Sequence, residues 1–510
     1  MFHDRSQRGV VSSVNLAFQF ILIMIRFVKS GCIRGYVRYR RKKLAVVAIL
    51  VTGLFLFVNF ESGSERISRQ EQLSAVRITS AEDVKGKSNG NLDFGRRNLP
   101  FNFDDIKVAH VLDTARETTP KKMHACPKII KKPRFREIVH GVLVYSLWFD
   151  DRKSQHFIRI LLMSLKKRTP SVTCLFQNDL TQKTIAVEAS FYEHNENYQR
   201  RFGGFIASCV VPKTLNSVPC SMNISVTLKT AQPGESNAMV FPVGSIDQLS
   251  GGQESRIQKR YGICIPPVYG DVYVGKIIEF LELMQILGAS HFTFYDLSIS
   301  ESVRNVLKYY EDLGLVSVFP WNLPSYIGKD DLHYFGQPLA IWDCLFRSMS
   351  HHDFVAFHDL DEFIVPLRHE NITSLLEYIH EEQHCGHCFE SVLFDTTSEG
   401  HSSRLITQSV FHRTSQVTPY WTKCIVDPRR IFEQGIHHIS KPIEEFYLAD
   451  KVNWNLARIF HYRKCQDPNA LFQPRCSAFT VDKTMQRFGK KLSFNFKLRM
   501  NILTDRKSRK

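Results

Sequence analysis

The sequence predicts an α/β fold, a mostly parallel sheet with helices on both faces, preceded by a small β-rich domain and an N-terminal transmembrane helix. Three observations predict it. An uncharged apolar run lies near the N-terminus, short β-rich runs recur over residues 135–250, and strand and helix patterns alternate within residues 251–510. Of the 510 residues, 43% are hydrophobic, which is enough apolar material for more than one domain.

The N-terminal part predicts a membrane anchor. Residues 44–60 carry no charge, and this length is near the lower limit for a helix that spans about 30 Å of hydrocarbon. Five basic residues stand within the six positions before the run, so the positive-inside rule places residues 1–43 in the cytosol and everything after Phe60 in the lumen. A cleaved signal peptide is the alternative, but Asn59-Phe60-Glu61 offers no small residues for cleavage. We therefore expect a single-pass type II protein.

An earlier apolar stretch, residues 16–25, leaves the role of residues 10–28 open. It fits an amphipathic cytosolic helix, a second span or an N-terminal extension. The expected orientation is the same in all three cases, because a basic cytosolic loop would still precede residue 44.

Charge and cysteine usage exclude one class of partner and indicate a compartment. The net charge of +17 could suggest nucleic acid, but seven basic residues cluster between Lys29 and Lys43 beside the apolar run, and the others are mixed with acids. We expect no nucleic acid partner. Eleven of the twelve cysteines follow the predicted anchor, where an oxidising lumen permits disulfides, and this odd number leaves at least one thiol unpaired or intermolecular. The glycosylation triplets at Asn223 and Asn371 agree with a lumenal location.

Beyond the anchor, the chain divides into three predicted parts. Residues 61–134 are polar without sustained apolar periodicity and predict a lumenal stem. Residues 135–250 predict a small antiparallel β domain, and residues 251–510 the catalytic α/β domain. The β-rich runs of the first domain are 139–149, 172–176, 184–192, 205–211, 223–228 and 238–243.

Within the α/β part, strand and helix patterns alternate up to His358. Strands are expected at 264–268, 291–295, 315–320 and 353–358, and helices at 272–287, 300–313 and 338–349. Repeated βα units predict a parallel sheet, and ligands of such sheets bind beyond the carboxyl ends of the strands. Acids stand at two of these ends, at Tyr295-Asp296 and in the segment from His358 to Glu362.

The three acids Asp359, Asp361 and Glu362 directly follow an apolar strand. Burying them together without a counter-ion would be costly, and their hard oxygens suit Mn²⁺ or Mg²⁺. The cation would neutralise a departing nucleoside diphosphate. A solvated acidic turn is the simpler interpretation of Asp-x-Asp alone.

Several motifs in the same order resemble glycosyltransferase family 92. They are VYVGKIIEFLELMQILGASHFTFYD at 272–296, QPLAIWDCLFR at 337–347, FHDLDEFIVP at 357–366 and His461-Tyr462-Arg463, with weaker upstream likeness at 144–152 and 205–212. The resemblance implies the GT-A type of glycosyltransferase fold and an inverting transfer of galactose from UDP-galactose with Mn²⁺ in the Golgi membrane. It also implies a glycan acceptor on a glycoprotein or glycolipid, such as galactose or fucose of an N-glycan.

The resemblance also suggests residue roles. Asp359 and Asp361 would bind the metal and the diphosphate, and Asp296 would bind uracil or ribose unless it is a structural cap. A third metal ligand is expected at His461, with His437-His438 as the rival. Glu362 is the first candidate for the general base that deprotonates the acceptor. Three other acids stay open for that role: Asp343, Asp395 and Asp427.

Two other functions compete with this interpretation. The motif Cys385-Gly-His-Cys388 is shared with disulfide isomerases, but it stands between a predicted helix at 375–382 and a strand at 389–394, which is the reverse of their order. We expect a local disulfide or two separate bridges there, and a zinc site is the further alternative. A membrane-anchored lectin is the second rival, with glycan bound by the β domain and Ca²⁺ by the Asp pair.

Overall fold

A computed structural model describes residues 132–167, 170–178, 182–215, 217, 219–228, 236–245, 261–397, 405–465 and 478–508. The predicted cytosolic tail, anchor and nearly all of the stem lie outside these ranges, and so does the expected domain boundary near residue 250. Among the residues that the structure does describe, no helix is both long enough and apolar enough to cross a membrane.

The N-terminal part of the described chain, residues 132–245, is rich in strands, and we call it the β region. Its strands join in the order β5-β4-β8-β9-β2-β3-β7-β6, with β1 beside β2, and all pairs are antiparallel except β2 with β9. A 3₁₀ helix, η1 (Asn195–Asn197), connects β6 to β7. The strands are β1 (Arg136–Val139), β2 (Val142–Asp150), β3 (Phe157–Leu165), β4 (Pro170–Gln177), β5 (Thr184–Glu188), β6 (Ser190–Glu193), β7 (Phe202–Val210), β8 (Ser221–Leu228) and β9 (Ser236–Ser245).

The sheet of the β region curls back on itself around its own core. The Cys174–Cys209 disulfide joins β4 to β7, although four strands separate them in the sheet order. Apolar residues of β2, β3, β4, β7, β8 and β9 pack together in one buried cluster. Strand β3 was not anticipated from the sequence, because nearly every residue of Phe157–Leu165 is buried and no period-two alternation marks it.

Residues 261–508 form the α/β region, and its predicted βα series is confirmed. Strands β10 (Tyr261–Gly270), β11 (Ala289–Ile299), β12 (Val316–Pro320) and β13 (Phe354–Phe357) pair in parallel in the order β12-β11-β10-β13. The helices between them are α3 (Val274–Ile286), α4 (Glu301–Asp312) and α5 (Gln337–Ser348), and the short η2 (His333–Gly336) leads into α5. The fold is therefore mixed α/β, as the alternating pattern predicts.

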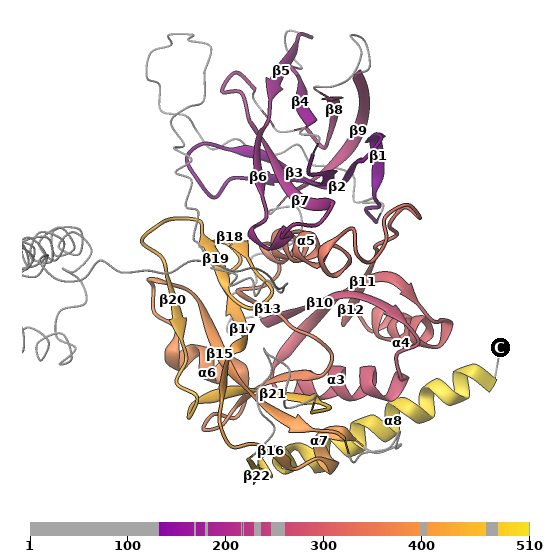
Figure 1. Cartoon of the computed structure of the whole chain (residues 1–510), viewed down its shortest axis with the longest axis vertical. Coiled ribbons are helices and arrows are strands. Elements are labelled where there is room, and N and C mark those ends of the chain that lie inside the picture. Colours follow the sequence, from indigo (N-terminus) through magenta and orange to yellow (C-terminus); the bar gives the residue numbers. More distant parts are fainter. Residues whose placement is uncertain are drawn as a thin grey trace, which may run out of the picture. The chain divides into compact units, whose positions relative to one another are not determined.

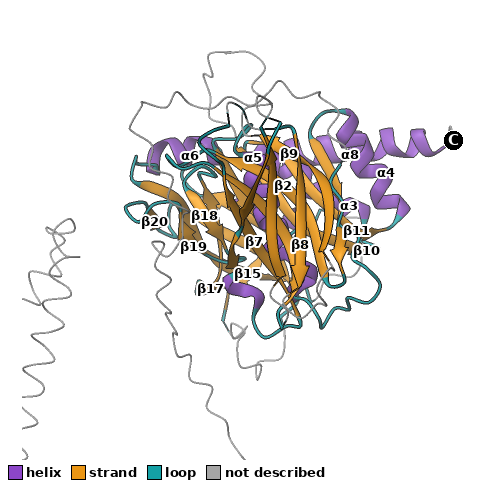
Figure 2. Cartoon of the chain, turned by 90° about the horizontal axis from the view of Figure 1, so that it is seen from above, coloured by secondary structure: helices purple, strands orange, loops and turns teal. Residues whose placement is uncertain are grey.

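Both faces of this sheet are covered, because neighbouring residues of one strand enter different cores. In β13, Phe354 and Ala356 pack in a core with α3 and α4, whereas Val355 and Phe357 pack in another with α5 and the β region. Figure 1 shows α5 between the sheet and the β region, with α3 and α8 on the other side. In the view from above, β2, β8 and β9 lie over the α/β region (Figure 2).

The rest of the α/β region extends the sheet with antiparallel strand pairs, except that β20 and β21 pair with β15 in parallel. After β13, the order continues through β17, β15, β16 and β22, while β14 pairs with β21. The predicted helix at 375–382 begins earlier, at Ile372, because Asn371 caps it with a capping box. The elements are β14 (Glu362–Pro366), α6 (Ile372–Ile379), β15 (His384–Asp395), α7 (Ile406–Ser409), β16 (His412–Thr414), β17 (Thr418–Val426), β18 (Ile431–Gln434), β19 (Ile439–Pro442), β20 (Leu448–Lys451), β21 (Ala457–Arg463), β22 (Phe479–Val481), η3 (Thr484–Phe488) and α8 (Gly489–Ser508).

Candidate active site

The predicted acids form a tight turn directly after β13, and we call residues Asp359–Glu362 the acid turn. The backbone N–H of Glu362 donates to the carbonyl of Asp359 at 3.2 Å, and the N–H of Asp359 donates to the Glu362 carboxylate at 3.3 Å. Because β13 is one of the parallel strands, the turn lies at the edge of the sheet where α/β proteins bind ligands.

A buried lysine contacts two of these acids. The Lys423 ammonium, on β17, lies 3.2 Å from Asp359 and 3.2 Å from Glu362, and the residue has no exposed surface. Burial alone would lower the pKa of Lys423, but the two carboxylates raise it above its ordinary value. Sequence reasoning missed this residue. The signal was a lysine beside Cys-Ile-Val in an apolar strand, which requires a buried counter-ion.

Asp361, in contrast, has a loose ion pair. The Lys276 ammonium, in the first turn of α3, is 3.6 Å from its carboxylate, and 40% of that lysine side chain is exposed. A pair this exposed contributes little to stability. Asp361 therefore keeps its carboxylate accessible to a ligand.

Two histidines flank the turn with unpaired ring nitrogens. His461 on β21 lies directly opposite Glu362 on β14, with its Nδ1 3.6 Å from the Glu362 carboxylate and without a hydrogen bond. His358 donates from Nδ1 to the Glu362 carbonyl at 2.9 Å, which leaves its buried Nε2 without a partner. Burial lowers the pKa of His358 to about 4 and also lowers the pKa of His461, so both rings are neutral at pH 7. Neutral imidazoles are metal ligands.

The rival histidine pair is also near the turn. His437 Nδ1 bonds the Thr422 carbonyl at 3.1 Å, and its pKa is lowered to about 4, chiefly by burial and then by the Lys423 charge. Its neighbour His438 is exposed and faces Glu196 of the β region at 3.8 Å. Within the described ranges, no three or more His, Cys, Asp or Glu residues are grouped so that they could hold a metal ion. The choice between His461 and His437 as a third ligand thus stays a prediction.

The base candidates have very different surroundings. Glu362 is 2% exposed, and burial raises its pKa to about 8 against the opposing charge of Lys423. Asp343 is fully buried in α5 and bonded by Ser146, Tyr295 and Arg347.

The other two acids are bonded to their own surroundings. Asp395 accepts backbone N–H groups of Thr397 and Cys465, and Asp427 pairs with Arg430 at 3.0 Å. Of the four candidates, Glu362 is therefore the one that belongs to the acid turn, and its carboxylate contacts Lys423.

Asp296 lies three residues before the end of β11 instead of at the end itself. Its carboxylate accepts the N–H of Ile299 at 3.1 Å and pairs with Arg304 of α4. These contacts hold the connection between β11 and α4, which agrees with the structural role considered for it. Its role in binding uracil or ribose stays a prediction.

Comparison with known proteins places this geometry in a family. The family model described as Glycosyltransferase family 92 matches residues 259–506, a stretch that contains the acid turn, Lys423 and both flanking histidines. This stretch is a family 92 glycosyltransferase domain.

Two relatives from Caenorhabditis elegans carry related names. A protein named Beta-1,4-galactosyltransferase galt-1 is 23% identical over 350 residues, which cover 66% of this chain and 79% of that protein. Glycosyltransferase family 92 protein F13G3.3 is 30% identical over 128 residues, covering 24% of this chain and 25% of its own length. The solved galactosyltransferase LgtC, in complex with donor and acceptor sugar analogs, aligns at 10% identity over 46% of this chain and 95% of its own, with a TM-score of 0.23.

The expectation for the cysteine motif at residues 385–388 is wrong. Cys385 and Cys388 lie three residues apart on β15, so their side chains point to opposite faces and cannot bridge. Cys388 instead bonds Cys424 on the neighbouring β17, and Cys385 is a buried free thiol. Neither a local disulfide nor two bridges is present, and the motif is not a redox dithiol. Two further disulfides among the described residues are Cys174–Cys209 and Cys264–Cys344.

Proposed function

We propose that this glycosyltransferase transfers galactose from UDP-galactose to a glycan acceptor, with a divalent cation bound at the acid turn. The observation that carries the proposal is the pairing of accessible carboxylates with unpaired imidazole nitrogens at the ligand-binding edge of a parallel sheet. The name of the galt-1 relative supports galactose as the transferred sugar.

The donor atoms at the acid turn are of the kinds that a hard cation such as Mn²⁺ takes, and a bound cation would have to draw them closer together than they stand in the described structure. Asp359 and Asp361 supply carboxylate oxygens, and the neutral ring of His461 supplies a nitrogen with no other partner. When bound, the cation would stabilise the charge that develops on the departing UDP. Lys423 holds Asp359 and Glu362 in place, and Asp296 with Arg304 would contact the uracil or ribose of the donor.

Glu362 is the proposed general base. An inverting transfer is a single displacement, so the protein supplies one base to the acceptor hydroxyl and no nucleophile. Burial raises the pKa of Glu362 to about 8, which makes its carboxylate a stronger proton acceptor than an ordinary glutamate. The expected product is a β-linked galactoside.

The location and the acceptor belong to the same proposal. A single helix at residues 44–60 would anchor the enzyme in the Golgi membrane as a type II protein, with the catalytic domain in the lumen. The acceptor would be a galactose or fucose residue of an N-glycan. Protection of all residues after Phe60 from protease added to sealed microsomes tests the orientation, and cleavage there would contradict it.

Donor turnover tests the activity itself. Full-length protein in detergent should release UDP from UDP-galactose in the presence of Mn²⁺, release none in EDTA, and prefer UDP-galactose in a panel of nucleotide sugars. A lectin would bind glycans and release no UDP. The anomeric coupling of the transferred galactose, measured by NMR, tests inversion, since an α-linked product would exclude it.

A further inference from the structure

Three aromatic side chains form an exposed cluster where the β region meets the α/β region. Tyr198 follows η1 in the β region, and His333 and Tyr334 belong to η2 of the α/β region. The ring centres of Tyr198 and His333 are 4.5 Å apart, and those of His333 and Tyr334 are 4.4 Å apart. Tyr198 is 56% and Tyr334 63% exposed. We call these three residues the aromatic platform.

The platform is held in a strained backbone conformation. Of the four non-glycine residues with positive φ in the described chain, two are Tyr198 and Tyr334, and a third is the adjacent Phe335. A left-handed conformation costs about 1–2 kcal/mol for a residue with a side chain. Such strain concentrates at ligand sites, where the surroundings enforce it.

Specific hydrogen bonds enforce the conformation from both sides. The Trp321 indole donates to the Phe335 carbonyl at 2.8 Å, and the Phe202 N–H of β7 donates to the Asp331 carbonyl at 2.8 Å. The second bond joins the strand after Tyr198 to the loop before Tyr334. The fold thus keeps both tyrosine rings against His333. Burial, Glu196 and Tyr334 together raise the pKa of Tyr198.

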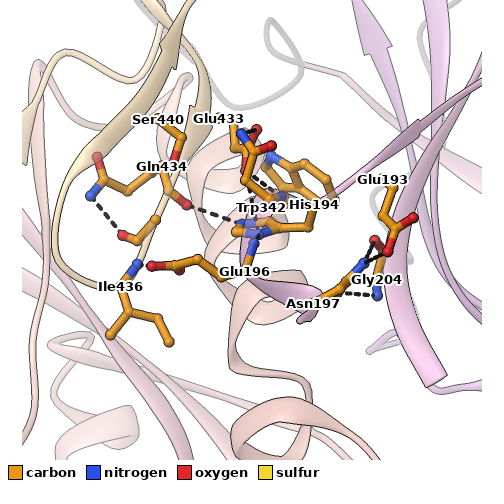
Figure 3. A network of polar contacts seen from close by, with 12 residues as sticks. Glu193, His194, Glu196, Asn197, Gly204, Trp342, Glu433, Gln434, Ile436 and Ser440 are labelled. Carbon is orange, nitrogen blue, oxygen red and sulfur yellow. Dashed lines mark hydrogen bonds and ion pairs between the residues drawn. The ribbon is translucent and has the colours of Figure 1, made fainter. Parts of the chain in front are cut away.

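A carboxylate connects the platform to the acid turn. Glu196, two residues before Tyr198, is 7% exposed and accepts the N–H of Ile436 at 2.7 Å (Figure 3). Its pKa is raised by burial, while the Ile436 bond and the charges of His438 and Lys423 lower it. Glu196 also lies 3.8 Å from His438, whose neighbour His437 bonds the carbonyl of Thr422, the residue before Lys423.

A second path leads from the platform to the same turn. The rings of Phe335 and Tyr269 are 4.9 Å apart, and Tyr269 lies at the carboxyl end of β10. Four residues later Tyr273 is the N-cap of α3, whose first turn carries Lys276, the partner of Asp361. Both paths place the platform beside the ligand-binding edge of the sheet.

We propose that the aromatic platform is the acceptor subsite of the enzyme, where Tyr198 and Tyr334 stack on the apolar C–H face of a neutral sugar ring and Glu196 accepts a hydrogen bond from one of its hydroxyls. The assignment rests on the proposed function. Aromatic rings with one well-placed polar group are typical of small-ligand sites. The charges around the platform favour a neutral sugar over an acidic one. Glu196 would repel a carboxylate, and the nearby basic residues Lys166, Arg200 and Arg201 are paired with Glu193, Asp330 and Asp331.

Substitution of Tyr334 separates binding from folding. Tyr334→Gly removes the ring and also relieves the positive φ, so its melting midpoint should be no lower than that of the wild type. In the full-length enzyme, its KM for a neutral galactose-terminated oligosaccharide should rise about tenfold, whereas KM for UDP-galactose stays within about twofold. Tyr334→Phe keeps the ring and should stay within about twofold on both constants.

A matched control and direct binding complete the test. Tyr378→Ala removes a tyrosine that is 69% exposed on α6 and should change neither KM. The assignment is overturned if Tyr334→Gly and Tyr198→Ala both leave the acceptor KM unchanged, or if Tyr378→Ala raises it equally. If the wild type releases no UDP, the proposed transfer fails separately. Saturation-transfer NMR with the same oligosaccharide then decides, since binding that is lost in Tyr334→Gly supports the platform and an absence of binding overturns it.

Discussion

Two acid clusters of the α/β region differ in how far their polar groups are satisfied. Asp343 has no exposed surface, and its carboxylate accepts Ser146 at 2.6 Å, Tyr295 at 2.7 Å and Arg347 at 2.6 and 3.1 Å. At the acid turn, 42% of the Asp359 side chain is exposed, and two neighbouring imidazole nitrogens have no partner. An acid whose carboxylate oxygens all accept hydrogen bonds inside the protein stabilises the fold. Accessible acids beside imidazole nitrogens without partners are typical of a ligand site.

The largest expected effect comes from breaking the satisfied cluster. Asp343→Ala leaves the Arg347 charge without its partner and the hydroxyl groups of Ser146 and Tyr295 without their acceptor. The free energy of unfolding should therefore fall by about 3–5 kcal/mol. Unfolding in denaturant, followed by tryptophan fluorescence, measures it. A loss below about 1 kcal/mol would show that the junction between the β region and α5 does not depend on this carboxylate.

A second buried acid at the same junction should make stability depend on pH. Glu433 on β18 accepts the Asn195 N–H at 2.9 Å and pairs with Tyr192, and burial raises its pKa to about 7 (Figure 3). The unfolded chain releases this proton near pH 4.5, so between pH 4.5 and 7 the native state binds more protons and stability falls as the pH rises, by roughly 3 kcal/mol in total.

Glu433→Gln should remove that dependence. Melting midpoints measured from pH 4.5 to 7.5 should fall less steeply in the variant than in the wild type. Glu377→Gln, at an exposed position of α6, should keep the wild-type slope. Equal slopes in all three proteins would contradict a raised pKa at Glu433.

At the acid turn, the same kind of substitution should affect activity instead of stability. Asp361→Asn should reduce transfer about 100-fold or more, because a ligand for the cation and a negative charge are lost together. Its unfolding free energy should stay within about 1 kcal/mol, since the Lys276 pair is exposed. Electron paramagnetic resonance should show weaker Mn²⁺ binding. Transfer at the wild-type level would exclude Asp361 as a ligand, and Asp359→Asn applies the same test to its neighbour.

The smallest effect is expected at the free thiol. Cys385→Ala removes one sulfur from the core and should cost about 1 kcal/mol, with transfer unchanged. A large loss of transfer would instead show that this thiol takes part in the active site.

Local sequence determined much of the fold. Every strand and helix expected between residues 264 and 358 is present. The spacing of apolar residues along such a run shows which of its faces are buried, and this spacing differs between helices and strands. The acid turn was predictable for the same reason, since three acids that directly follow an apolar strand must lie at its end. The capped start of α6 and the all-buried strand β3 were missed, the latter because uniform burial erases periodicity.

Tertiary structure alone decided what surrounds those acids. Lys423 reaches Asp359 because β13 and β17 are neighbours in the sheet, and His461 stands opposite Glu362 because β14 pairs with β21. The partner of Cys388 likewise follows from strand register. Glu196 arrives from another region of the chain through its bond to Ile436. Pairing between distant strands depends on the packing of the whole core, which no local pattern encodes, so the sequence revealed the acids and only the fold revealed their partners.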